Sequence, residues 1–230
     1  MNLTGKKIVV TGAFGALGAV VSAALRSAGA QVACIDFAPT TKAPASLAGF
    51  VRIGDADLSS TTAAATALQS AASQLGGMTG IVNIAGGFRW EKIADGDIAT
   101  WDLMFNLNVR TAVNAVRAAL PHLKGPGARI VNIGAAGAIK AAAGMGSYAA
   151  SKAGVAKLTE SLAEELKDDG VTVNAILPSI IDTPVNRADM PTAEFDRWVK
   201  PEQVADLIVF LLSDRASAIT GALIPISGRV

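Results

Sequence analysis

The sequence predicts an α/β protein built on a doubly wound parallel sheet, with helices on both faces. Short apolar, β-branched runs alternate with longer alanine-rich stretches along the whole chain, a pattern typical of repeated strand–helix–strand units. Runs such as residues 8–10 and 80–82 are continuously apolar, which indicates strands buried on both faces. No linker, composition shift or internal repeat divides the 230 residues, so we expect one domain over 1–230.

Each element follows from this alternation of runs. The expected strands cover residues 7–11, 31–36, 50–53, 80–85, 128–134, 172–177 and 222–226. The expected helices cover residues 16–28, 60–75, 98–123, 146–168 and 201–212. Residues 179–200 form the longest irregular stretch, and a loop of that length after a late strand is typical of a lid over a site.

Composition excludes several classes of function. Twenty basic residues balance nineteen acidic ones without a basic stripe, so no nucleic-acid partner is expected. The single cysteine, Cys34, cannot form an internal disulfide and fits a reducing compartment. The single histidine, His122, rules out a two-histidine zinc motif, and no metal site is expected.

The uncharged segment 8–25 raises the question of a signal peptide or membrane span, because two lysines precede it. Three evenly spaced glycines interrupt it, namely Gly12, Gly15 and Gly18. A strand, a glycine turn and a helix therefore explain the segment better, and we expect a cytoplasmic protein without a membrane partner. The alternative is a secreted protein that has lost its first 25 residues, which an intact-mass measurement would reveal.

The same glycines predict a nucleotide site. The stretch TGAFGALG at 11–18 follows a predicted strand and opens a predicted helix. Glycine permits a tight turn and close approach of the backbone to a pyrophosphate, and the helix N-terminus supplies free N–H groups. Asp36 ends the next strand, where a carboxylate can bind ribose hydroxyls and would repel a 2′-phosphate. We therefore expect NAD, with NADH preferred over NADPH; the alternative for Asp36 is a helix cap or a solvated turn residue.

The catalytic candidates lie in the helix predicted at 146–168. Tyr148 is the only tyrosine of the chain, and Lys152 follows it by four residues, so both side chains share one helix face. An ammonium beside a phenol stabilises the phenolate and lowers the tyrosine pKa toward the working pH. The phenol could then give a proton to a carbonyl or take one from an alcohol. The spacing alone occurs by chance in many helices, and it becomes specific together with the glycine turn and Asp36.

Together these motifs resemble the short-chain dehydrogenase/reductase family over nearly the full chain. The matching pieces stand in the family's order: TGAFGALG at 11–18, Asp36, Asp57 with Leu58, VNIAG at 82–86, Asn108, Tyr148 with Lys152, and PSIIDTP at 178–184. The resemblance implies a Rossmann-like fold, an NAD(P)-dependent oxidoreductase acting on a small molecule, and a homodimer or homotetramer.

The resemblance also implies a role for each matching residue. Tyr148 is the general acid/base, supported by Lys152 and by Asn108, whose backbone helps to hold a water linked to the lysine. Cofactor contacts are implied for Gly12, Gly15, Ala16, Leu17, Gly18, Asp36, Tyr148, Lys152 and Pro178, for Asp57 and Leu58 near the adenine, for Asn83, Ala85 and Gly86 along the adenosine, and for Ile181 and Thr183 at the nicotinamide carboxamide.

Two positions depart from the family pattern. The family's turn reads TGxxxGxG, whereas this chain has Ala16 at the sixth position and a glycine at Gly15, so a small residue still faces the phosphates. Thirteen residues before the tyrosine, where the family has a serine, this chain has Ala135. Ser147 and Ser151 flank the tyrosine, but on a helix they are expected to point away from its face. Losing one oxyanion donor can cost about 3 kcal/mol, so the sequence indicates an impaired enzyme or a substrate that does not need that donor.

A smaller resemblance bears on the substrate. The loop at 182–198 and the Ala-Gly-Gly-aromatic segment at 85–88 are similar to dihydropteridine reductases, which also carry alanine in place of the serine. A quinonoid pterin accepts hydride into a delocalised ring, so little alkoxide develops. The substrate candidates are Ala135, Phe88, Trp90 and Arg187, although the two aromatic residues equally fit loop packing and the arginine fits a solvated loop.

Two other functions stay open at this point. One is a generic carbonyl or alcohol oxidoreductase. The other is a catalytically impaired NAD-binding regulatory protein, for which the missing serine is the motive. The retained Tyr148 and Lys152 argue against the regulator, because a pure binder has less need of the phenol.

Overall fold

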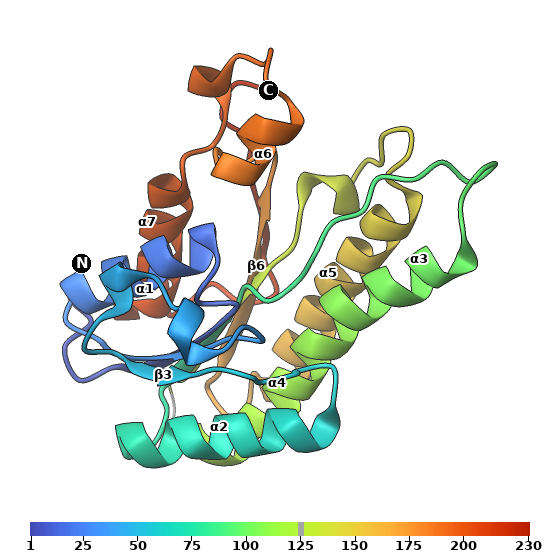
Figure 1. The fold of residues 1–230 in the computed structure, drawn as a ribbon. Coiled ribbons are helices and arrows are strands. Elements are labelled where there is room, and N and C mark those ends of the chain that lie inside the picture. Colours follow the sequence, from blue (N-terminus) through green and yellow to red (C-terminus); the bar gives the residue numbers. More distant parts are fainter. Residues whose placement is uncertain (124–126) are drawn as a thin grey trace.

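The computed structural model describes residues 1–123 and 127–230, which are organised around one parallel sheet (Figure 1). Its seven strands lie in the order β3-β2-β1-β4-β5-β6-β7, and every neighbouring pair is parallel. The strands are β1 (Lys7–Thr11), β2 (Gln31–Ile35), β3 (Val51–Ile53), β4 (Gly80–Asn83), β5 (Arg129–Ile133), β6 (Thr172–Pro178) and β7 (Leu223–Ile226). The predicted doubly wound parallel sheet is confirmed.

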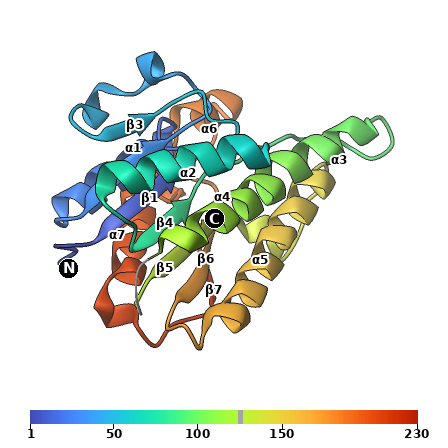
Figure 2. The same cartoon turned by 90° about the horizontal axis from the view of Figure 1, so that it is seen from below.

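Helices cover both faces of this sheet (Figure 2). They are α1 (Ala16–Ser27), α2 (Thr61–Leu75), α3 (Ile98–Met104), α4 (Thr111–Ala119), α5 (Gly146–Leu166), α6 (Pro184–Asp189) and α7 (Pro201–Leu212). Helices α1 and α7 pack together over one face, and α2, α4 and α5 cover the other. Within residues 1–123 and 127–230, none of the helices combines the length and hydrophobicity that crossing a bilayer requires.

The central strands explain why their sequences are continuously apolar. In β1, Ile8 and Val10 belong to the core beneath α1 and α7, whereas Val9 belongs to the core beneath α2, α4 and α5. All three are at most 1% exposed. Successive side chains of a strand point to opposite faces, and both faces are covered here. The segment at 8–25 is thus a strand, a turn and a helix.

The segment expected as a helix at 98–123 is helical from Ile98 to His122, but it is not α-helical throughout. Between α3 and α4 the chain forms a π-helical turn, Phe105–Arg110, and a short 3₁₀ turn, Leu120–His122, follows α4. A π-turn accommodates one additional residue within a helix and is frequent at functional sites. Apolar periodicity does not reveal it, because the residues on both sides of the turn are helical.

The stretch at 179–200 contains more regular structure than expected. Thr183 caps α6, since its hydroxyl accepts a hydrogen bond of 3.3 Å from the backbone N–H of Asn186, and Pro184 occupies the first helical turn. A threonine followed by proline is a helix-start signal that the prediction overlooked. A second turn, Phe195–Arg197, precedes α7.

Candidate nucleotide-binding and active site

The turn between β1 and α1 is closely packed. Gly12 has φ +65°, and a Cβ there would lie 2.7 Å from the backbone nitrogen of Ala85. A Cβ on Gly18 would lie 2.1 Å from the carbonyl oxygen of Gly12. Thr11 joins the turn to the end of β4, because its hydroxyl accepts a hydrogen bond of 3.3 Å from the Ala85 N–H. The helix N-cap, Gly15, makes no side-chain capping bond and the first turn holds no acidic residue, which leaves N–H groups of α1 for an anion.

Gly18→Ala is expected to destabilise the protein by about 1–3 kcal/mol, because the methyl group would meet backbone atoms that cannot move aside. Gly15→Ala is the matched control, since a Cβ there meets its nearest atom at 3.5 Å. Urea denaturation followed by circular dichroism measures both free energies of unfolding. Equal stabilities of the two variants would contradict the steric argument.

A cavity of about 760 Å³ lies beside this turn, at the carboxyl ends of the strands. Of the predicted cofactor residues, its lining includes Gly12, Gly15, Ala16, Leu17, Gly18, Asp36, Asp57, Leu58, Ala85, Gly86 and Thr183. The prediction missed other lining residues, which are Phe37, Ala56, Ser59, Ile84, Leu103, Asn106, Leu107, Thr111 and Val185. Several of these belong to the π-helical turn or its flanks, where helical periodicity alone does not show which side chains reach the cavity.

Asp36 lies between the glycine turn and the loop that follows β2. Its carboxylate accepts hydrogen bonds from the backbone N–H groups of Phe14, at 2.8 Å, and Ala38, at 2.9 Å. The side chain also lines the cavity. Asp36 is therefore a turn residue, as its alternative interpretation held, and at the same time it presents a negative charge to the cavity.

Asn83 lies away from the cavity lining. It is buried, and its amide donates to Asn132 Oδ1 at 2.9 Å, while the Asn132 amide donates to Thr159 Oγ1 at 2.9 Å. Asn83 Oδ1 itself has no hydrogen-bond partner in the described part of the chain. The strand alternation of β4 directs this side chain toward α5, so the cavity meets the backbone that follows Asn83 instead.

Pro178 and Ile181 also lie outside the residues that line the cavity. Pro178 ends β6, in register with Ile226 of β7. Ile181 forms a parallel bridge with Val199 and packs against the core beneath α1 and α7. Their implied cofactor contacts stay predictions.

Tyr148 and Lys152 lie on α5, as the spacing predicted. Lys152 is 6% exposed, its ammonium donates to the carbonyl of Ile133 at 2.8 Å, and it lies 6.0 Å from the centroid of the Tyr148 ring. Burial lowers the pKa of Lys152 to about 8. Burial also raises the pKa of Tyr148 to about 12. The expected lowering of the tyrosine pKa is thus absent in this arrangement, because desolvation of the phenol dominates and the ammonium is bonded to a carbonyl.

Asn108 lies in the π-helical turn and is 1% exposed. Its amide donates to the Gly87 carbonyl at 3.1 Å and to Ser151 Oγ at 2.9 Å, and its oxygen accepts from the Gly87 N–H at 2.9 Å. The side chain, which the sequence had not implicated, therefore joins the loop after β4 to α5. Ser151 was expected to point away from the tyrosine face, and its hydroxyl accepts the hydrogen bond from Asn108.

The four substrate candidates have different surroundings. Ala135 is buried just after β5. The Phe88 ring lies edge-to-face on Tyr148, whereas Trp90 donates to the carbonyl of Ala143 at 3.0 Å and packs on that loop. Arg187 binds Asp182 through two hydrogen bonds, of 2.5 and 2.9 Å, so its guanidinium is engaged within its own loop. Phe88 thus lies beside Tyr148. Trp90 packs on a loop, which agrees with the second of its two interpretations.

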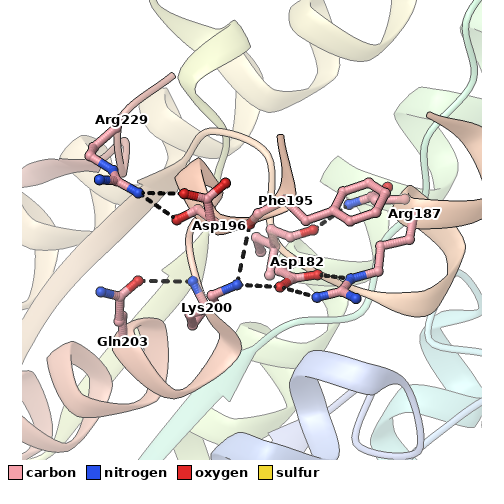
Figure 3. A network of polar contacts seen from close by, with 9 residues as sticks. Asp182, Arg187, Phe195, Asp196, Lys200, Gln203 and Arg229 are labelled. Carbon is pink, nitrogen blue, oxygen red and sulfur yellow. Dashed lines mark hydrogen bonds and ion pairs between the residues drawn. The ribbon is translucent and has the colours of Figure 1, made fainter. Parts of the chain in front are cut away.

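Ion pairs hold the segment between β6 and α7 (Figure 3). The Asp182 carboxylate, 7% exposed, accepts from both Arg187 and Lys200, and these cations hold its pKa well below the usual range. At the C-terminal end, Arg229 donates to the carboxylate of Asp196 at 3.0 Å (Figure 3). This segment carries Thr183 and Val185 to the cavity, so the ion pairs fix one of its walls.

The fold and the site define a class of protein, the dinucleotide-binding α/β proteins with a tyrosine–lysine pair. A family model described as Enoyl-(Acyl carrier protein) reductase matches residues 12–228. The chain is 33% identical to 2-(S)-hydroxypropyl-CoM dehydrogenase 3 of Xanthobacter autotrophicus, over 99% of this chain and 97% of the relative. It is 30% identical to D-beta-hydroxybutyrate dehydrogenase of Rhizobium meliloti, over 97% of each.

Solved structures agree with these sequence matches. A short chain dehydrogenase from Burkholderia cenocepacia in complex with NADP superposes with a TM-score of 0.91 at 34% identity, covering 99% of this chain and 98% of the other. A short-chain dehydrogenase/reductase from Serratia marcescens gives a TM-score of 0.90 at 30% identity, with the same coverage. The chain belongs to the short-chain dehydrogenase/reductase family, and it is an NAD(P)-dependent oxidoreductase.

Proposed function

We propose that this oxidoreductase uses NADH to reduce a quinonoid, pterin-like ring, with Tyr148 as the proton donor. The observation that supports the proposal is the pairing of Tyr148 with buried Lys152 on α5 while Ala135 stands where the family has serine. Such a site can supply a proton, but it lacks the hydroxyl that would stabilise an alkoxide. A substrate that develops little alkoxide suits this arrangement.

The residues of the turn fit a dinucleotide. Gly12 and Gly18 leave no room for side chains, and the open N-terminus of α1 offers N–H groups to a pyrophosphate. Gly15, Ala16 and Leu17 complete this cradle, and Asp36 would hold the adenosine ribose. A bound nicotinamide dinucleotide supplies the hydride.

The catalytic residues divide the remaining work. Tyr148 holds its proton at ordinary pH, because burial raises its pKa, and it can release that proton only where positive charge stabilises the phenolate. Lys152 carries the nearest ammonium, and its pKa of about 8 lets it exchange a proton near neutral pH. Asn108 holds the loop after β4 against α5, and Phe88 covers one side of the phenol.

Asp36→Ala is expected to narrow a preference for NADH over NADPH by about 1–3 kcal/mol, because the carboxylate at the cavity would no longer repel a 2′-phosphate. Fluorescence titration of both reduced cofactors measures the two dissociation constants. Asp57→Ala is the comparison variant, because that carboxylate also lines the cavity but is implied to lie near the adenine, so its loss should change the affinity for both cofactors alike. Equal affinities in the unmodified protein would remove the basis for the NADH assignment.

Ala135→Ser tests the substrate class. For a pterin-like ring the added hydroxyl meets no developing alkoxide, so pterin turnover changes little, while activity on ketones and aldehydes rises by at most two to three orders of magnitude. NADH oxidation against quinonoid dihydropterin, quinones and simple carbonyls measures both variants.

Other outcomes of the same comparison would select the alternatives. A broad gain on carbonyls, with no pterin activity in either variant, indicates a carbonyl oxidoreductase that has lost its serine. Tight NADH binding without turnover of any substrate, in both variants, indicates the regulatory protein.

A further inference from the structure

We propose that Phe88 is a positioning residue for Tyr148, and that a clamp formed by the side chains of Asn108 and Ser151 holds Phe88 in place. The inference rests on the proposed role of Tyr148 as proton donor. It assigns to Phe88 a part in orienting the tyrosine, beyond its predicted contact with substrate.

The first observation is the contact between the two aromatic rings. The ring centroids of Phe88 and Tyr148 are 4.9 Å apart, and the ring planes are inclined by 82°. This edge-to-face geometry is the favourable one for aromatic pairs. Phe88 is 45% exposed, so it contributes little to the core. Its buried side is used against the tyrosine.

The second observation is that the residue before Phe88 is held on both of its backbone polar groups. The N–H of Gly87 donates to Asn108 Oδ1 at 2.9 Å, and its carbonyl accepts from Asn108 Nδ2 at 3.1 Å. Asn108 is 1% exposed, so water does not compete for these bonds. The direction in which Phe88 leaves the backbone is therefore set by Asn108.

The third observation is that Asn108 is also bonded to α5, the helix that carries the tyrosine. Asn108 Nδ2 donates to Ser151 Oγ at 2.9 Å, and Ser151 Oγ donates to the backbone carbonyl of Tyr148 at 2.7 Å. Ser151 is 4% exposed. The contacts thus close a ring from Tyr148 through Ser151, Asn108 and Gly87 to Phe88, and back to the tyrosine.

The glycines before Phe88 make this approach possible. A Cβ on Gly86 would lie 2.5 Å from Asn108 Oδ1, and a Cβ on Gly87 would lie 2.9 Å from Leu107 Cδ1. Side chains at these positions would push the loop away from the π-helical turn. The sequence Gly-Gly-aromatic at 86–88 is therefore a means of delivering one ring to the tyrosine.

Phe88→Leu tests the proposal, because leucine keeps an apolar side chain and removes the ring contact. We expect kcat to fall about 3- to 10-fold while the dissociation constant for NADH stays unchanged. Phe50→Leu is the matched control, since Phe50 stacks on Arg26, which lies on α1. An unchanged kcat in Phe88→Leu, or an equal loss in Phe50→Leu, would overturn the proposal.

A second measurement does not depend on turnover. Tyr148 is the only tyrosine, so the ultraviolet absorbance of the phenolate reports its ionisation alone. In Phe88→Leu the phenol becomes more hydrated, and its pKa should move down toward the ordinary value of 10.0. If Tyr148 proves not to donate the proton, this titration still reports whether Phe88 positions it. An unaltered titration would overturn the proposal independently.

Ser151→Ala, alone and combined with Phe88→Leu, tests the clamp. If Ser151 acts through Phe88, the loss of kcat in the double variant should be smaller than the product of the two single losses. Losses that multiply would show that the two residues act separately and would overturn the clamp. Circular dichroism of each variant verifies that α5 is intact. The titration of Tyr148 should shift in Ser151→Ala as it does in Phe88→Leu. Ser151→Thr, which keeps the hydroxyl, should show the titration of the unmodified protein.

Discussion

Tyr148→Phe is expected to lower turnover by about two to four orders of magnitude while the protein still binds NADH. The substitution deletes only the phenolic hydroxyl and retains the ring that Phe88 contacts. Steady-state NADH oxidation measures turnover, and fluorescence titration measures cofactor affinity. Phenylalanine keeps the ring of this half-buried residue, so the replacement should be compatible with folding.

Two controls make this result interpretable. The unfolding curve of Tyr148→Phe should match that of the unmodified protein, which separates lost chemistry from lost structure. The affinity for NADH should stay within about threefold, because neither the glycine turn nor Asp36 is altered. Normal turnover of the best substrate by Tyr148→Phe would show that this tyrosine does not transfer the proton.

Lys152→Met is expected to abolish most of the turnover and, at the same time, to stabilise the fold. Burial lowers the pKa of Lys152 from 10.5 to about 8, which means that folding disfavours the charged form. A shift of this size corresponds to roughly 3 kcal/mol at pH 7. Loss of the charge-assisted bond to the Ile133 carbonyl offsets about 1–2 kcal/mol of this gain, so the net stabilisation should be about 1–2 kcal/mol. Urea denaturation at pH 7 measures it.

The sign of the pH dependence follows from the same pKa. Between pH 8 and 10.5 the unfolded chain holds the Lys152 proton and the folded protein does not, so stability contributed by this group rises with pH across that window. Reductive turnover should instead fall above about pH 8, because the ammonium that supports the phenolate is lost. Lys152→Met should lack both effects. A pH profile that is flat through this range in the unmodified protein would contradict the assignment.

Most of the fold could be predicted from local patterns. The runs at 8–10 in β1 and 80–82 in β4 are continuously apolar, and a strand covered on both faces explains such short runs. The spacing of Tyr148 and Lys152 places them on one face of α5 through helix geometry alone. Gly12 and Gly18 stand where the close packing of the turn excludes side chains. Each of these inferences depends on neighbours in sequence.

Other parts of the site depended on contacts between distant segments. Asn108 lies in a π-helical turn. Its side chain binds Gly87, in the loop after β4, and Ser151, on α5. Asn83 appears in a motif that implies the adenosine, yet its side chain lies toward α5. Sequence periodicity places a residue on a face but does not show what that face meets.

The sequence by itself determined the parallel sheet, the glycine turn and the identity of the tyrosine–lysine pair, because strand and helix periods and glycine geometry are local properties of the chain. Only the tertiary structure decided how these groups behave. The spacing suggested that Lys152 lowers the pKa of Tyr148, whereas burial raises it and directs the ammonium to the Ile133 carbonyl. Desolvation depends on every segment that packs around a group, and that arrangement arises only when β4, α5 and the π-helical turn come together.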